Sequence, residues 1–431
     1  SLYGFPAGAT TFTVTNLNDS GPGSLRQAIL DTNATADDDT IVFQSGLSGT
    51  ITLTSGELVI SSDLTIDGLE ATVLAISGNH TSRIFTINFG TTVIIEGLTI
   101  KEGQPAGNGG GILNNGTLNV SNSILSGNSA DSGGGIFNNE GAILTMSNST
   151  IDGLKLDHLN AGAGGGIANT AGGTLTVINS TVSNNWAVDG GGIDNAGMAT
   201  VRNSSISGNK GIGGIFNSGT LMVINSTLSG NFTIWGGGGI LNTNGPNHST
   251  LTVINSTITG NTASDGGGIT NFAGNILILG NSIVAGNTAS MGKEINNFGV
   301  FTSQGHNLFG ENGASEVEGG TLATSDIVPT VGISAILAPL GNYGGPTQTH
   351  LLVPDSPAIN AGDNALIPAG FTTDQRGFPR IQAGTVDIGA VEVGEAGATD
   401  IPTLSQWAAL GLTALLLGLS GWWLWRMKSS A

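Results

Sequence analysis

Residues 213–231 read GGIFNSGTLMVINSTLSGN, and the chain repeats this unit many times. The unit opens with glycines and an Ile-x-Asn triplet, continues with alternating apolar and polar residues, and closes on Asn-Ser before a third short segment. Alternation with a period of two is typical of a strand with one buried face. Eight units carry the triplet, and their asparagines are Asn114, Asn138, Asn169, Asn195, Asn217, Asn242, Asn271 and Asn297.

The spacing of these triplets predicts the fold. Successive triplets begin 22 residues apart at the closest (Ile193 to Ile215) and 31 at the widest (Ile136 to Ile167). Three short strands in such a unit, broken at Asn or Gly corners, indicate a parallel β-helix, in which each coil covers the apolar face of its neighbour. We therefore expect an all-β, right-handed solenoid of roughly ten coils, with the eight triplet asparagines stacked as an amide ladder.

The rest of the chain divides around this repeat. Residues 1–50 are expected to form an N-terminal strand and helix cap, and residues 51–310 the β-helix itself. Prolines become frequent after residue 328, and because proline removes a ladder donor, residues 311–393 are interpreted as an irregular final coil and C-terminal cap. Internal ion pairs are expected there among Asp374, Arg376, Arg380 and Asp387. Residues 394–400 are expected to form a linker, and residues 401–431 a separate tail.

Composition limits the partners of the rod. The chain has 30 acidic and 11 basic residues, a net charge of −19, and no cysteine. This charge makes nucleic acid an unfavourable partner, and the lack of cysteine excludes disulfides and thiolate metal sites. The five histidines share no spacing suited to a metal, so we expect neither metal nor cofactor.

The tail predicts attachment to a membrane. Residues 408–425 contain no charged residue and are rich in leucine, and this length just reaches the range that spans a bilayer. Interfacial tryptophans and a basic end follow the usual pattern of a membrane anchor with its short end in the cytoplasm and the rod outside. The predicted anchor residues are Trp422, Trp423, Trp425, Arg426 and Lys428.

Two family resemblances extend this interpretation. The run Ile401, Pro402, Thr403, Leu404, Ser405, Gln406, Trp407, followed by an apolar segment and a basic end, resembles the IPTL-CTERM sorting signal of bacterial surface proteins. Residues 14–29, 356–363, 373–380 and 386–392 resemble choice-of-anchor Q and related right-handed β-helix proteins. The first resemblance implies export and a partner sorting enzyme of the exosortase type; the second implies no common activity.

The function expected from these observations is structural, adhesive or scaffolding, at a bacterial surface and without enzymatic activity. Surface glycans and other membrane proteins are the expected partners besides the membrane and the sorting enzyme. An accessory subunit of a membrane complex remains an alternative. So does a polysaccharide lyase or glycoside hydrolase, since some of these enzymes have a β-helix fold.

Catalysis would need carboxylates held together on one face, or a calcium site with a nearby base. The coils offer scattered candidates, which are Asp131, Asp152, Asp157, Asp189, Asp194, Asp265, Glu294, Lys155, Arg202, Lys210 and Lys293. Asp131, Asp189 and Asp265 recur just before a glycine run and are expected at one corner, as solvated turn residues or a weak Ca²⁺ site. Trp186 and Trp235 are the main aromatic residues expected to be available for stacking on sugars.

Overall fold

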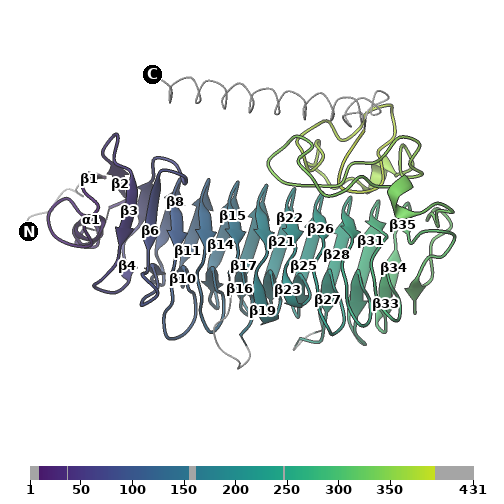
Figure 1. The fold of residues 1–431 in the computed structure, drawn as a ribbon, viewed down its shortest axis with the longest axis horizontal. Coiled ribbons are helices and arrows are strands. Elements are labelled where there is room, and N and C mark those ends of the chain that lie inside the picture. The colour runs from purple at the N-terminus through teal and green to yellow at the C-terminus, as the bar shows by residue number, and fades with distance from the viewer. Residues whose placement is uncertain (1–8, 36, 155–161, 246–247, 394–431) are drawn as a thin grey trace, which may run out of the picture.

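The computed structural model describes residues 9–35, 37–154, 162–245 and 248–393. They form a rod of stacked coils with an irregular segment along one side of its C-terminal half (Figure 1). The coils build three parallel sheets of 12, 11 and 11 strands. The predicted parallel β-helix is therefore confirmed; it is of the right-handed type and has about 11 coils, slightly more than the sequence indicated.

Each coil places one strand in each of the three sheets, which we name A, B and C. Sheet A contains β1 (Thr11–Val14), β2 (Asp39–Phe43), β5 (Leu64–Asp67), β8 (Thr92–Glu96), β11 (Thr117–Ser121), β14 (Ile143–Ser147), β17 (Thr174–Ile178), β21 (Met198–Arg202), β25 (Thr220–Ile224), β28 (Thr250–Ile254), β31 (Ile276–Gly280) and β34 (Val300–Ser303). Sheet B contains β3 (Gly49–Thr52), β6 (Leu74–Ser77), β9 (Thr99–Lys101), β12 (Ile124–Ser126), β15 (Thr150–Asp152), β18 (Thr181–Ser183), β22 (Ser205–Ser207), β26 (Thr227–Ser229), β29 (Thr257–Thr259), β32 (Ile283–Val284) and β35 (Leu308–Phe309). Sheet C contains β4 (Leu58–Ile60), β7 (Phe85–Ile87), β10 (Ile112–Asn114), β13 (Ile136–Asn138), β16 (Ile167–Asn169), β20 (Ile193–Asn195), β24 (Ile215–Asn217), β27 (Ile240–Asn242), β30 (Ile269–Asn271), β33 (Ile295–Asn297) and β36 (Val317–Glu318).

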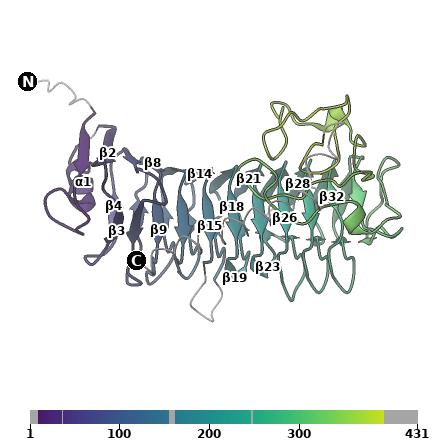
Figure 2. The same ribbon diagram turned by 45° about the horizontal axis from the view of Figure 1, so that its top comes forward.

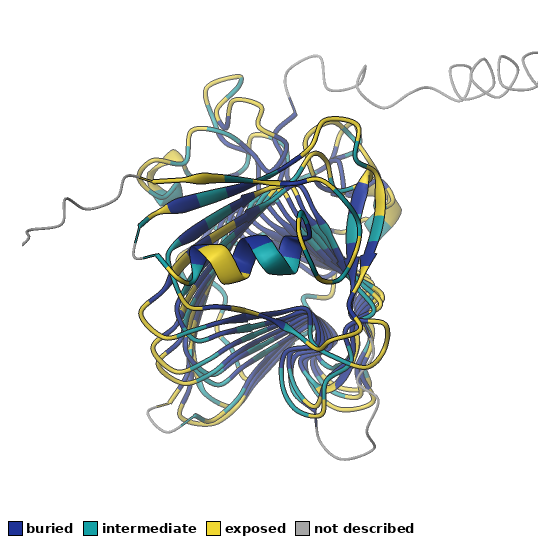
Figure 3. Ribbon diagram, turned by 90° about the vertical axis from the view of Figure 1, so that its left-hand side faces the viewer, coloured by how far each residue is buried: buried dark blue, intermediate teal, exposed yellow. Residues whose placement is uncertain are grey.

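The Ile-x-Asn triplets are the strands of sheet C, and their register explains the core. Ile215 pairs with Ile193 on one side and Ile240 on the other, and all three are fully buried. Alternate residues of sheets A and B also point inward, so one continuous apolar core fills the rod (Figure 3). No coil buries its inner face alone, which is why stacking is required for stability.

The asparagine that precedes each serine makes the corner between sheets A and B. From Asn122 to Asn281, seven such asparagines have φ between 46° and 52°, a left-handed conformation that asparagine tolerates better than most residues. The serine that follows is buried, and its hydroxyl accepts a hydrogen bond from the backbone N–H of the preceding coil's serine, as Ser226 does from Ser204 at 3.1 Å. The corner thus turns the chain and links neighbouring coils.

The triplet asparagines lie in one column inside the rod. The side-chain Nδ2 of each donates to Oδ1 of the asparagine in the next coil, over 2.7–2.8 Å at every step from Asn114 to Asn297. All eight are buried, and the last one donates to the carbonyl oxygen of Gly319 at 2.7 Å. Their role in the described structure is to join the coils.

A second ladder, which the sequence analysis did not identify, runs between sheets B and C. Its links join Asn185, Asn209, Asn231, Asn261 and Asn287 over 2.9–3.0 Å. Asn287 then donates to the carboxylate of Glu294 at 2.6 Å. Glu294 stands where the preceding coil has Gly268, so its side chain takes the place of the next asparagine and ends the ladder.

Burial of Glu294 gives the ladder end a pH dependence. Burial raises the pKa of this carboxyl from 4.5 to about 7, so the folded protein favours its protonated form. Its contribution to stability is complete below pH 4.5 and is lost as the pH rises through about 7. We expect Glu294→Gln, which stays neutral, to gain stability relative to the wild type across this interval, as measured by urea unfolding. Glu318→Gln, at an exposed position of β36, is the control, and an equal pH profile for both variants would contradict the prediction.

The N-terminal end of the rod is covered by α1 (Leu25–Thr32), which lies across the opening (Figure 3). Ser24 caps this helix by accepting a hydrogen bond from the N–H of Gln27 at 3.2 Å. Leu25 and Ile29 are buried against the first coils. This is the helix that the sequence indicated as a cap.

The C-terminal region of the described chain has two parts, one at the end of the core and one along sheet B. Phe301, Val317 and Leu322 pack against the end of the core and cover it. Residues 336–393, which include the short 3-10 helix η2 (Asn364–Leu366), lie along the outer face of sheet B and do not cover the end of the rod (Figures 1 and 2). We call residues 336–393 the side segment. The other short 3-10 helix, η1 (Ile333–Ala335), directly precedes it.

The side segment is fixed by long-range polar contacts. Thr227 of β26 donates to Oε1 of Gln375 at 2.6 Å, and Ser229 contacts Nε2 of His350 at 2.9 Å. Asn225 and Asn281, at two corners of the rod, donate to the carbonyl oxygens of Thr373 and Asp363.

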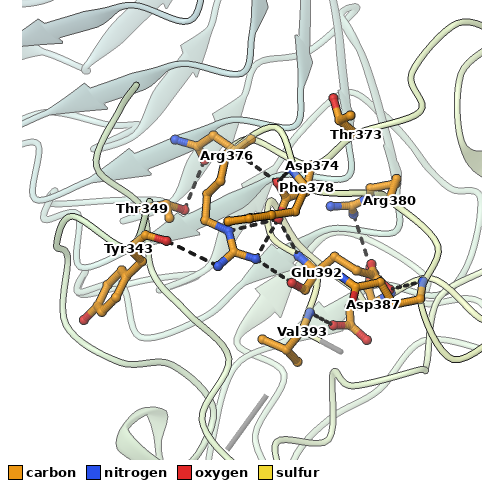
Figure 4. A network of polar contacts seen from close by, with 12 residues as sticks. Tyr343, Thr349, Thr373, Asp374, Arg376, Phe378, Arg380, Asp387, Glu392 and Val393 are labelled. Atoms are coloured by element: carbon orange, nitrogen blue, oxygen red, sulfur yellow. Dashed lines mark hydrogen bonds and ion pairs between the residues drawn. The ribbon is translucent and has the colours of Figure 1, made fainter. Parts of the chain in front are cut away.

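The ion pairs expected in the side segment are present in part (Figure 4). Arg376 pairs with Asp374 at 2.9 Å, and both side chains are buried. Arg380, in contrast, donates its Nη2 to the backbone carbonyl oxygens of Asp387 and Gly389. The predicted side-chain ion pair of Arg380 is therefore wrong, because its guanidinium bonds to backbone carbonyl oxygens.

The tail predictions concern residues beyond Val393. The sorting motif at 401–407 and the anchor at 408–428 lie outside the described residues. Within residues 9–35, 37–154, 162–245 and 248–393, no helix has the length and apolar character needed to cross a bilayer.

Candidate functional site

The outer face of sheet C forms the floor of a groove. The middle residue of each Ile-x-Asn triplet points outward, because its two neighbours point into the rod. Strand pairing places these outward residues in one row, which includes Asp194, Phe216, Leu241, Thr270 and Asn296. The members of the row from Phe216 to Asn296 carry no charge, and the next member, beside Phe216, is Asp194.

Turns on either side of sheet C form the walls. On one side, Ile234, Trp235, Asp265 and Met291 precede the strands, and Asp265 pairs with Gly236 and Met291 in neighbouring coils. On the other side, Phe272 and Phe298 follow the ladder asparagines, and their rings stack with centroids 6.3 Å apart.

The groove has a volume of about 750 Å³. It is lined by Ile212, Phe216, Ile234, Trp235, Gly236, Leu241, Thr243, Ser264, Asp265, Thr270, Phe272, Met291, Asn296 and Phe298. Trp235 is 62% exposed and Ile234 68% exposed, so large apolar side chains are presented to solvent. An apolar cleft with a few polar groups is the usual form of a binding site for an organic ligand.

A smaller hollow of about 330 Å³ adjoins the groove and shares Ile212, Ile234 and Trp235 with it. Its lining also includes Trp186, Lys210 and Phe232. The two tryptophans indicated by the sequence for sugar stacking therefore lie on one connected surface.

Two half-buried carboxyl groups, of Asp194 and Asp189, lie near the groove without lining it, and strand pairing places Asp194 beside Phe216. Asp194 has a pKa raised to about 7, mainly because burial disfavours its charge and also because of the nearby Asp189 carboxylate. Burial likewise raises the pKa of Asp189. Gly190 makes the tight corner between them: its φ is +55°, and a Cβ there would lie 2.2 Å from the carbonyl oxygen of Ile193. The structure thus brings together two of the scattered acidic candidates.

The other candidates are more dispersed. Asp189 and Asp265 occupy the same position relative to their glycine turns, whereas Ser132 occupies that position in the coil of Asp131. Asp152 accepts hydrogen bonds from Ser183 and Asn184 at the sheet B side, and Lys293 pairs with Glu316 at 2.8 Å. Lys155 and Asp157 lie outside the described residues. The described part of the chain contains no group of three His, Asp or Glu side chains placed to hold a metal ion.

Sequence reasoning missed most of the groove. Phe216 is the variable middle residue of a triplet, and Phe272 and Phe298 directly follow Asn271 and Asn297, so none of the three belongs to the repeated pattern. The floor of the groove could have been predicted from the triplets. The residue between Ile and Asn must face outward, and the corresponding residues of successive coils must form a row.

Comparison with known proteins identifies a shared fold. No family model and no curated protein matches the sequence. The crystal structure of pectate lyase Pel9A matches with a TM-score of 0.52 and 15% identity, over 90% of this chain and 97% of that one. The structure of a PL6 family alginate lyase, AlyGC, matches with a TM-score of 0.31 and 11% identity, over 79% of this chain and 55% of that one. The likeness to pectate lyase Pel9A shows the β-helix fold.

This similarity corrects one expectation. The expectation of a protein without enzymatic activity is contradicted by a structural neighbour, matched over nearly its whole length, that is a lyase. The β-helix fold is therefore shared with a lyase.

Proposed function

We propose that the protein is a carbohydrate-active β-helix that binds a polysaccharide in the groove over sheet C. The observation that carries the proposal is the groove itself, where four aromatic side chains, Phe216, Trp235, Phe272 and Phe298, surround a cleft of about 750 Å³. Pyranose rings present C–H faces that pack on aromatic rings and hydroxyls that bind polar side chains. The groove supplies both, through its aromatic walls and through Thr270, Asp265 and Asn296.

The shape of the groove also suits a polymer. Its floor crosses four neighbouring strands, β24, β27, β30 and β33, and strands in a sheet lie ~4.8 Å apart, so the floor extends for about 15 Å along the rod. The adjoining hollow continues the surface past Trp235. Such a length accommodates several successive sugar units.

Trp235→Ala tests this proposal. Loss of a central aromatic contact at a binding site costs roughly 2 kcal/mol, so we expect a roughly 30-fold weaker affinity for the bound polysaccharide. Binding is measured by affinity electrophoresis and calorimetry on a panel of soluble glycans. Phe89→Ala is the matched control, because Phe89 is 87% exposed and lies outside the groove. If no glycan in the panel binds the wild type, or if both variants bind equally, the proposal is wrong.

We further propose that the protein is exported and held at a bacterial membrane by residues 401–431. The proposal rests on the IPTL-like run at 401–407, the uncharged stretch at 408–425 and the basic residues that follow. A variant that ends at residue 400 is expected in the soluble extracytoplasmic fraction, and the full chain in the membrane fraction after a high-salt wash. Retention of the shortened chain in the membrane would contradict this.

A further inference from the structure

The ionisable residue that lines the groove is acidic, and the basic residues nearby lie outside its lining. Asp265 is the sole ionisable residue among those that line it in the described part of the chain. Asp194 lies in the strand beside Phe216, and Asp189 is close to Asp194. Lys210 lines the neighbouring hollow, beyond Ile234 and Trp235, which line both spaces. Lys293, in the turn after Met291, is paired with Glu316.

This arrangement disfavours a uronate polymer. A polymer with one carboxylate per sugar would bring its negative charges toward the carboxylates of Asp265 and Asp189 in a protein of net charge −19. Elimination on such a polymer also needs a cation to neutralise the uronate and a base to take a proton. Within residues 9–35, 37–154, 162–245 and 248–393, no group of three His, Asp or Glu side chains is placed to hold that cation.

We propose that the groove binds an uncharged polysaccharide and that Asp194 and Asp189 hydrolyse it. The inference rests on the proposed function and narrows its substrate and its reaction. Its geometric basis is the position of the two carboxyl groups: Asp194 continues the row of outward residues that forms the groove floor, and the corner at Gly190 places Asp189 beside it. Hydrolysis of a glycosidic bond needs such a pair of carboxyl groups, one protonated and one ionised.

The step balances with water as the only co-reactant. The carboxyl group of Asp194 gives its proton to the leaving glycosidic oxygen as the C1–O bond breaks. A water oxygen forms the new bond to C1, and its proton passes to the carboxylate of Asp189. The raised pKa of Asp194, about 7, supports its role as the group that holds a proton near neutral pH.

The experiment uses the full chain and measures binding and product separately. The probes are neutral polymers (xylan, mixed-linkage β-glucan, galactomannan) and uronate polymers (polygalacturonate, alginate), the latter with and without Ca²⁺. We expect binding and new reducing ends with a neutral polymer, and no unsaturated product from the uronates. Asp194→Asn should lower turnover 10²- to 10⁴-fold with an affinity within about threefold of the wild type, and should remove the pH limb near neutrality. Asp131→Asn, at an exposed turn outside the groove, is the control.

The outcomes separate the two levels of the proposal. Binding or elimination of a uronate polymer would overturn the inference and leave the proposed function standing. Binding of a neutral polymer with full turnover in Asp194→Asn would overturn the assigned chemistry. No binding of any polymer would overturn the proposed function itself.

Discussion

Replacing Asp374 by asparagine is expected to detach the side segment from the rod while the coils remain folded. The Asp374 carboxylate is fully buried and accepts five hydrogen bonds: from the N–H groups of Arg376, Phe378 and Glu392, and from Nε and Nη2 of Arg376 (Figure 4). An amide can accept only part of this set and leaves the Arg376 charge buried without its partner. Breaking a buried ion pair in this way costs about 3–5 kcal/mol.

The loss is expected to be local because Asp374 adjoins the docking contact of Gln375 with Thr227. Limited proteolysis should cut Asp374→Asn within residues 336–393 much faster than the wild type, and circular dichroism should retain the sheet signal of the coils. Asp355→Asn, at an exposed turn of the same segment, is the control. Cooperative unfolding of the whole protein at the same denaturant concentration as its side segment would show that the two parts are not separable.

Replacing Asn217 by leucine is expected to destabilise the rod by roughly 2–4 kcal/mol. Asn217 accepts a hydrogen bond from Asn195 and donates one to Asn242, so the change leaves a donor on one side and an acceptor on the other without a ladder partner. Each buried group left unsatisfied costs roughly 1–3 kcal/mol. Asn195 keeps its contacts with the carbonyl oxygens of Gly197 and Thr220, which holds the total below the sum of two complete losses.

The measurement is urea unfolding of the full chain, with Asn119→Leu as the control. Asn119 lies at an outward position of β11, so the same chemical change there leaves both ladders intact. Similar unfolding midpoints for the two variants would show that the ladder adds nothing beyond the packing of its neighbours.

The repeat made the rod predictable from sequence, and non-repeating contacts could not be predicted in the same way. Ile215 and Asn217 recur in equivalent places because each must match the coil above and below, so periodicity reports stacking directly. The contact of Thr227 with Gln375 joins residues 148 apart in sequence and belongs to no period. For that reason the sequence predicted an end cap, whereas residues 336–393 lie along sheet B.

The groove shows the same limit in another form. Trp235 could be singled out from composition, because tryptophan is rare in the coils, but its proximity to Phe272 and Phe298 depends on the lengths of the turns around sheet C. The raised pKa of Asp194 depends on burial and on Asp189, neither of which a residue pattern reports. The coils can therefore be predicted from the sequence, whereas the positions of the groove residues relative to one another require the structure.

The two asparagine ladders also give the rod an electrical direction. In every link the amide nitrogen points toward the C-terminal coils, so the side-chain dipoles add along the axis in place of cancelling. Hydrogen bonds in such a chain polarise one another and strengthen together. The positive end of the second ladder meets the carboxyl of Glu294, and that of the first meets the carbonyl oxygen of Gly319. Adding or deleting a whole coil would lengthen or shorten this dipole without disturbing any single link, so rods of different length can keep the same polarity.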